Sequence, residues 1–266
     1  MIRIIPKPTD TPEDNSTQMV LDALDTLNAQ YKLLHLNEIN PFRVPYKGDL
    51  IWVCGIRQNG VEFEQIKALS LKNRLVNTPE AIATCASKVM TSALLCHHGV
   101  PTPETLFTAS QEAVEAFLLK HGKAVYKPVY GFDGDGIFLF SDISDLAEPP
   151  YYIQEYVRND RDFRVFVIGY NAVGAIYRQS PHLTHNIHKG GVGTPVEIDP
   201  AMRRIAEAAA KAVGIDYCGV DLLRTDDGYT VLEVNGTPNW HCMAAPIPHL
   251  MAEYLVREEE SLKKLK

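Results

Sequence analysis

Apolar residues in the first third of the chain alternate between two spacings, which indicates strands and helices in turn. Short apolar runs predict strands over 2–6, 32–36, 49–56 and 73–77. Apolar residues at helical spacing predict helices over 14–29 and 61–70. This alternation is typical of a small α/β domain. We place the end of that domain near Asn77.

A second unit is predicted to begin with a helix. Thr78 suits the N-cap, Pro79 suits the first helical position, and the apolar-periodic run ends at Gly99, so one helix is expected over 78–99. The pattern then predicts a helix over 110–122 and strands over 123–129, 137–140 and 151–157. A glycine-rich hairpin over 130–136 joins the first two of these strands.

The remainder of the chain also mixes helix and strand. Strands are predicted over 162–169, 172–179, 217–225 and 229–235, and a helix over 200–214. Asp199 suits the N-cap of that helix, and Gly214 suits its end. The charged tail over 257–266 is expected to be a solvated or frayed helix end. The predicted domains are therefore 1–77, 78–157 and 158–266.

The last two predicted strands carry polar residues in an otherwise apolar run. A three-residue hairpin loop over 226–228 would place Asp221 opposite Glu233 and leave Asn235 on the same face. Opposed carboxylates repel unless they are protonated, solvated or bridged by a cation, and oxygen ligands of this type suit Mg²⁺. An ordinary solvated hairpin face is the alternative. The opposite, aliphatic face would carry Val220, Leu222, Leu232 and Val234.

The glycine-rich hairpin carries a second feature of chemical interest. Lys127 ends an apolar strand, and the glycines that follow allow the backbone to approach a polyanion closely. A lysine beside such a loop suits phosphate, although surface hairpins use glycine too. Asp133 and Asp135 within the loop would repel a bare phosphate.

Composition narrows the class of function. The 266 residues are 45% hydrophobic and 22% charged, so the chain can form a sizeable core. The formal net charge of −7 argues against nucleic acid or an anionic membrane as the main partner. The sequence shows neither an apolar run of the roughly 18–20 residues that a membrane span needs nor the apolar stretch of a signal peptide, so a cytoplasmic location is expected. Five scattered cysteines are expected to be reduced thiols.

Several motifs, in chain order, resemble those of the ATP-grasp superfamily, in particular the RimK-like carboxylate-amine ligases. They are Lys88, YKPVYGFDGDGI, YIQEYV, DFRVFVIG, HNIHKGGVG, GVDLL and VLEVNGTP, and they span residues 80–240. The resemblance implies an α/β N-terminal domain followed by an α+β ATP-grasp fold, in which two subdomains clasp ATP.

The resemblance also implies roles for individual residues. Those that would hold ATP are Lys88, Lys127, Gly131, Gly134, Gly136, Glu155, Tyr156 and Asp162. Those that would hold magnesium are Asp221, Glu233 and Asn235, the same residues that the predicted register brings together. Those implied in catalysis are Arg178, Lys127 and Asn186.

The implied activity is amide-bond formation through an acyl phosphate, with ATP and two Mg²⁺ ions, which Mn²⁺ could replace. The expected substrates are an amino acid such as glutamate and a carboxylate-bearing small molecule or cofactor, a tetrahydromethanopterin-type coenzyme being one candidate. Relatives suggest a homodimer or homotetramer. Alternatives are modification of a protein C-terminus, a non-catalytic nucleotide-binding regulatory module, and zinc binding at His182, His185 and His188.

Overall fold

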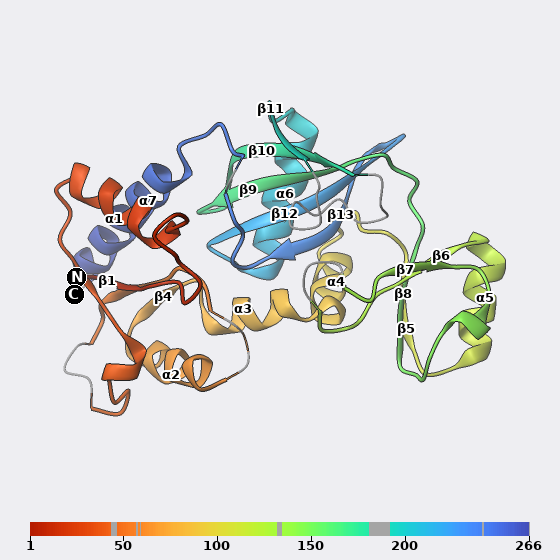
Figure 1. Cartoon of the computed structure of the whole chain (residues 1–266), viewed down its shortest axis with the longest axis horizontal. Helices are drawn as coiled ribbons and strands as arrows, with labels where there is room; N and C mark the ends of the chain where they lie inside the picture. The colour runs from red at the N-terminus through yellow and green to blue at the C-terminus, as the bar shows by residue number, and fades with distance from the viewer. Residues whose placement is uncertain are drawn as a thin grey trace.

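The computed structural model describes residues 1–43, 47–56, 58, 60–131, 135–180, 192–240 and 242–265. Figure 1 shows three groups of elements along the long axis of the molecule, each built around its own sheet. The N-terminal sheet lies at one end, the sheet of strands β9 to β13 lies in the middle, and the sheet of strands β5 to β8 lies at the other end.

The N-terminal sheet is parallel and has the strand order β2-β1-β3-β4. Its strands are β1 (Ile2–Ile5), β2 (Tyr31–Leu33), β3 (Leu50–Val53) and β4 (Arg74–Val76). Its helices are α1 (Ser16–Thr26), α2 (Val61–Ser70) and a short 3₁₀ turn at Leu36–Glu38. All four residues of β3 are buried, as expected for a parallel strand that is covered on both faces.

The C-terminal helix α7 (Ile247–Lys264) lies beside α1 on the N-terminal sheet, although the strand before it in the chain, β13, belongs to the third sheet (Figure 1). Ile247, Met251 and Leu255 repeat at helical spacing and are fully buried in a cluster shared with β1, β3 and α1. The charged tail is therefore the largely exposed end of an 18-residue helix, in agreement with the expected solvated helix end. The prediction did not extend this helix back over the apolar residues at 247–256.

The second sheet follows two helices where one was expected. These are α3 (Pro79–Ala86) and α4 (Lys88–His97), separated by Ser87. The Ser87 hydroxyl accepts a hydrogen bond from the Met90 backbone N–H at 3.3 Å, so Ser87 caps a new helix. The single-helix prediction was wrong at this residue.

The second sheet is antiparallel and has the strand order β5-β8-β6-β7. Its strands are β5 (Thr105–Thr108), β6 (Ala124–Tyr126), β7 (Phe138–Phe140) and β8 (Tyr151–Glu155). Helix α5 (Gln111–His121) and a 3₁₀ turn at Ile143–Asp145 pack against one face. The other face carries Lys127 and Gln154 at its edge and is turned toward the third sheet.

The third sheet is antiparallel and has the strand order β11-β10-β9-β12-β13. Its strands are β9 (Asp162–Ile168), β10 (Asn171–Gln179), β11 (Val192–Val196), β12 (Tyr217–Thr225) and β13 (Gly228–Asn235). Helix α6 (Pro200–Val213) covers one face. Asp199 caps α6, and Gly214 ends it in the left-handed conformation, as the sequence predicted.

The β12–β13 hairpin pairs Asp221 with Glu233, as predicted, but its loop is shorter than predicted and a β-bulge makes up the difference. The loop has two residues rather than three, since Thr225 pairs with Gly228. A β-bulge after Asp221 adds a residue on β13 and restores the expected pairing. As a result Val231 is fully buried, whereas Leu232, which was predicted to join the core, is only half-buried.

The turn between β9 and β10 anchors α7. Gly169 has φ 55°, and a Cβ placed on it would lie 2.8 Å from Cε2 of Tyr254 on α7. That ring is tethered, because the Tyr254 hydroxyl donates to Asp216 Oδ1 at 2.8 Å. Gly214 offers a matched case, with φ 72° and open space around the same position.

We predict that Gly169→Ala lowers the free energy of unfolding more than Gly214→Ala does. Both changes place alanine in the left-handed region, which costs about 1–2 kcal/mol. Only Gly169→Ala also overlaps the Tyr254 ring, which adds about 1–3 kcal/mol. Urea unfolding of both variants measures the difference. Equal losses would show that the ring moves aside without cost.

Candidate functional site

The face of the third sheet opposite α6 is divided into an apolar half and a charged half. Phe166, Ile168 and Tyr217 form the apolar half and pack into the cluster that contains α7. At the border lies Gly219, where a Cβ would stand 2.9 Å from Pro238 Cβ and 3.3 Å from Arg164 Cδ. Only glycine fits there. The charged half carries Asp162, Arg164, Arg178, Asp221, Glu233 and Asn235.

Asp221 is the centre of the charged half and accepts four hydrogen bonds. Arg164 donates two, from Nε to Oδ1 at 2.7 Å and from Nη2 to Oδ2 at 2.8 Å. Arg178 Nη2 donates at 2.9 Å, and Asn235 Nδ2 donates at 3.2 Å. Three of these donors share Oδ2, whereas Oδ1 accepts one hydrogen bond and keeps a second acceptor site.

The charged half also includes Asp162, which was predicted to hold ribose. Arg178 donates to both Asp162 oxygens, at 2.6 and 2.9 Å, and Arg178, Asp162 and Asp221 are all buried. Burial would raise the pKa of Asp221, but Arg164 and Arg178 together hold it well below its usual range. Asp221 is therefore ionised at neutral pH. Asp162, Arg178 and Asp221 were predicted site residues, but the ion pairs between them were not predicted.

The predicted magnesium ligands lie together at this edge of the sheet. Glu233 faces Asp221 across the two strands and is half-buried. Asn235 touches Asp221 directly. Two carboxylates and an amide form an oxygen donor set that fits Mg²⁺. A cation at Oδ2 would have to compete with its three donors, whereas Oδ1 accepts one hydrogen bond and has room for a further ligand.

Lys127, which follows β6 of the second sheet, is close enough to Glu233 and Asp221 for their charges to influence its pKa. Its ammonium donates to Gln154 Oε1, and Gln154 Nε2 donates to Thr105 Oγ1 at 2.9 Å. Gln154 is 1% exposed, so its geometry is fixed by its two partners. Burial lowers the pKa of Lys127 to about 8; Glu233 opposes that decrease, and Lys88 adds to it. Gln154 was not among the predicted site residues.

The glycine-rich hairpin lies next to the start of α4. Lys88 is the first residue of that helix, and its Nζ donates to the Gly131 carbonyl at 3.2 Å. Gly136 has φ 71° and packs on Pro128, where a Cβ would stand 2.9 Å from Cγ. Two lysines from different elements therefore flank this loop. Gly134, a further predicted loop residue, lies outside the described residues.

The residues expected to meet adenine lie at and just beyond the end of β8. The Glu155 backbone N–H donates to the Glu104 carbonyl at 2.9 Å, and the Glu155 side chain accepts from the Glu104 backbone N–H at 3.0 Å. His121 lies 3.6 Å from the same side chain. Glu155 thus joins β8 to the segment before β5, and Tyr156, which follows it, is half-buried.

Other predicted residues fall outside the described part of the chain. These are Asn186 and the three histidines His182, His185 and His188. Within the described ranges, no group of three or more His, Cys, Asp or Glu side chains is arranged to hold a metal. The same ranges contain no helix that is long and apolar enough to cross a membrane.

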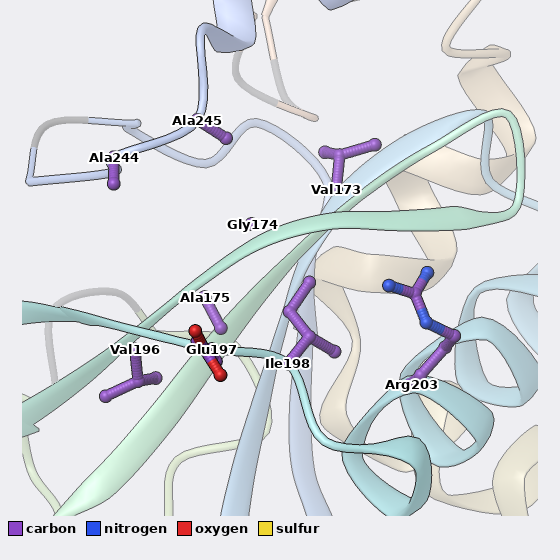
Figure 2. Close-up of a pocket in the computed structure, with 9 residues that line it drawn as sticks. All are labelled: Val173, Gly174, Ala175, Val196, Glu197, Ile198, Arg203, Ala244 and Ala245. Atoms are coloured by element: carbon purple, nitrogen blue, oxygen red, sulfur yellow. The ribbon is translucent and has the colours of Figure 1, made fainter.

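A separate pocket of about 410 Å³ lies beyond the end of β11, beside β10 and the start of α6 (Figure 2). Arg203 borders it, and its guanidinium already donates to the Ala172 carbonyl at 2.8 Å. Of the described residues that line this pocket, none belongs to the charged half of the sheet. The pocket is therefore not the candidate site.

Comparisons with known proteins agree with the fold and the resemblance. A family profile described as the RimK-like ATP-grasp domain matches residues 85–252. The chain is 33% identical over 208 residues to the tetrahydromethanopterin:alpha-L-glutamate ligase of Methanocaldococcus jannaschii, covering 70% of this chain and 72% of that one. It is 36% identical over 180 residues to beta-citrylglutamate synthase B of Homo sapiens, covering 61% and 46% respectively.

Among solved structures, the ATP-grasp ligase PsnB complexed with minimal precursor, Mg and ADP gives a TM-score of 0.76. The superposition covers 97% of this chain and 98% of that one, at 21% sequence identity. The predicted ATP-grasp fold class is therefore confirmed.

We predict that Arg178→Ala lowers the free energy of unfolding by about 3–5 kcal/mol, because it removes one partner from a buried ion pair. Arg161→Ala is the matched control, since Arg161 makes a comparable pair with Asp160 on the surface. Exposed pairs contribute little, so the control should unfold like the unmodified chain. Chemical denaturation compares them, and similar losses would contradict the central place given to the Arg178 contacts.

Proposed function

Because this chain belongs to the RimK-like ATP-grasp family and is a ligase, we propose that it joins a carboxylate to the amine of an amino acid, with ATP as the energy source. The observation that carries this proposal is the grouping of Asp221, Glu233 and Asn235 on one edge, with Lys127 electrostatically coupled to both carboxylates. Such a site can bind a polyphosphate and a divalent cation together.

We assign the phosphate groups of ATP to Lys88, Lys127 and the backbone of the glycine-rich hairpin. Two ammonium groups neutralise part of the polyphosphate charge, and the hairpin backbone approaches it closely. Glu155 and Tyr156 would meet adenine, largely through backbone groups. Asp162 now has Arg178 as its partner, so a contact with ribose would be added to that ion pair.

We assign Mg²⁺ to Glu233, Asn235 and Asp221. When bound, the ion would neutralise charge on the transferring phosphoryl group. Glu233 and Asn235 would contribute oxygen ligands, and Asp221 would contribute Oδ1, which accepts one hydrogen bond at present. The proposal includes two ions at this site and the ability of Mn²⁺ to replace Mg²⁺.

The chemical role of the chain's own residues follows from charge. A carboxylate is a poor electrophile, and transfer of the γ-phosphoryl group of ATP converts it to an acyl phosphate with release of ADP. Attack by an amine then forms the amide and releases phosphate. Lys127 holds the γ-phosphoryl group in place, and Arg178 supplies positive charge for the developing oxyanion.

We propose glutamate as the amino acid. Both curated relatives named above have glutamate in their names, as the added residue or as part of the product. The acceptor proposed first is a tetrahydromethanopterin-type coenzyme, because the relative with the greater coverage of this chain is named for it. A small polycarboxylate is the second candidate acceptor, on the basis of the human relative's name.

The direct test is mass spectrometry of reactions that contain ATP, Mg²⁺, glutamate and either class of acceptor. We expect a product heavier by one glutamyl residue, together with stoichiometric ADP. Glu233→Gln should give neither, because it removes a charged oxygen ligand, whereas the exposed Glu253→Gln should behave like the unmodified chain. Nucleotide binding without ADP release for any acceptor would instead support a regulatory module.

We also predict that nucleotide affinity falls as pH rises through about 8. The Lys127 ammonium attracts phosphate below that pH and is lost above it, because burial lowers its pKa. If binding needs that charge, the dissociation constant for a non-hydrolysable ATP analogue, which keeps a γ-phosphoryl group, should rise roughly tenfold between pH 7 and pH 9. Titration of a fluorescent form of that analogue measures this change. In Lys127→Arg, which stays charged, the dependence should disappear; its persistence would assign the titration to another group.

A further inference from the structure

Asn77 joins the N-terminal sheet to the strand that carries Asp221. It follows β4, is fully buried, and its side-chain Oδ1 accepts from the Tyr217 backbone N–H at 2.9 Å. Its Nδ2 donates to the Tyr217 carbonyl at 2.8 Å. The amide side chain therefore bonds to both backbone groups of the first residue of β12, as a peptide group of a neighbouring strand would.

The same amide also holds the end of β13. Nδ2 of Asn77 donates a second hydrogen bond, at 2.8 Å, to the carbonyl of Gly236. Gly236 directly follows Asn235, and Gly219 pairs with Asn235 in the hairpin. Asn77 thus bridges β12 and β13 immediately beyond the last ladder pair, next to a residue assigned to the metal.

Packing around Gly236 adds to this constraint. A Cβ at Gly236 would lie 3.3 Å from Ile215 Cδ1 and 3.4 Å from Cys85 Cβ. The backbone at this point therefore packs close to α3 and to Ile215, which follows Gly214 at the end of α6, and it also accepts the hydrogen bond from Asn77. It has little freedom to shift while Asn77 is present.

We propose that Asn77 is a positioning residue for the proposed metal site, which acts by fixing Gly236 so that the Asn235 side chain reaches Asp221. The N-terminal domain then contributes to the chemistry through one amide, without touching substrate. This inference rests on the proposed function, because it needs the β12–β13 ribbon to hold a cation. Groups that support a ligand in this way typically change metal affinity by about 10–100-fold when removed.

The test compares Asn77→Ala with Asn73→Ala. Asn73 is also buried, and its amide bridges two backbone groups, from Asp49 and Leu69, at the opposite end of β4. Both changes remove a buried amide, so both should lower thermal stability. The distinguishing measurement is the Mg²⁺ concentration that half-saturates the Mg²⁺-dependent part of fluorescent ADP binding.

We expect Asn77→Ala to raise that concentration about tenfold or more, with the Mg²⁺-free affinity for ADP unchanged. Asn73→Ala should leave both quantities as in the unmodified chain. If Asn77→Ala does not fold, Asn77→Asp replaces it, because it keeps the acceptor for the Tyr217 backbone N–H but loses the donor to the Tyr217 and Gly236 carbonyls.

The outcomes separate this inference from the function on which it rests. If the half-saturating Mg²⁺ concentration of the Asn77 variant lies within twofold of that of the unmodified chain, the role of Asn77 is overturned but the proposed metal site is not. An unmodified chain whose ADP binding does not respond to Mg²⁺ would overturn the proposed metal site, and this inference with it.

Discussion

Buried ion pairs on one face of the third sheet link three of its strands. Asp162 and Asp221 lie on adjacent strands in a buried setting, and each is held by an arginine from a neighbouring strand. A buried carboxylate without such partners would take up a proton or destabilise the fold. The arginines come from β9 and β10 and the aspartates from β9 and β12. Their ion pairs therefore also help to fix the register of these three strands.

This arrangement explains how one sheet serves both packing and chemistry. The half of the face near the N-terminal domain is apolar and receives α7, while the other half is polar and lies toward Lys127. Gly219 marks the border, where Pro238 and the stem of Arg164 approach too closely for any side chain. The charged residues are thus confined to the edge where the second and third sheets face one another, which is where a nucleotide clasped by two subdomains would lie.

Some of this could be predicted from the sequence and some could not. The pairing of Asp221 with Glu233 was correct although the loop length was wrong, because the bulge on β13 compensated for the shorter turn. Helix α6 was predicted correctly because Asp199 and Gly214 are local signals. The arginine donors to Asp221 were not predicted, since Arg164 and Arg178 lie 57 and 43 residues away along the chain. The hydrogen bonds from Asn77 to Tyr217 and Gly236 were hidden for the same reason.

Asp221, Glu233 and Asn235 are proposed to bind together the cation that accompanies the nucleotide. A crystal structure of the chain with Mg²⁺ and ADP would show whether they do. We expect a metal coordinated by oxygens of these three side chains. A metal held by other residues would show that the proposed site is wrong.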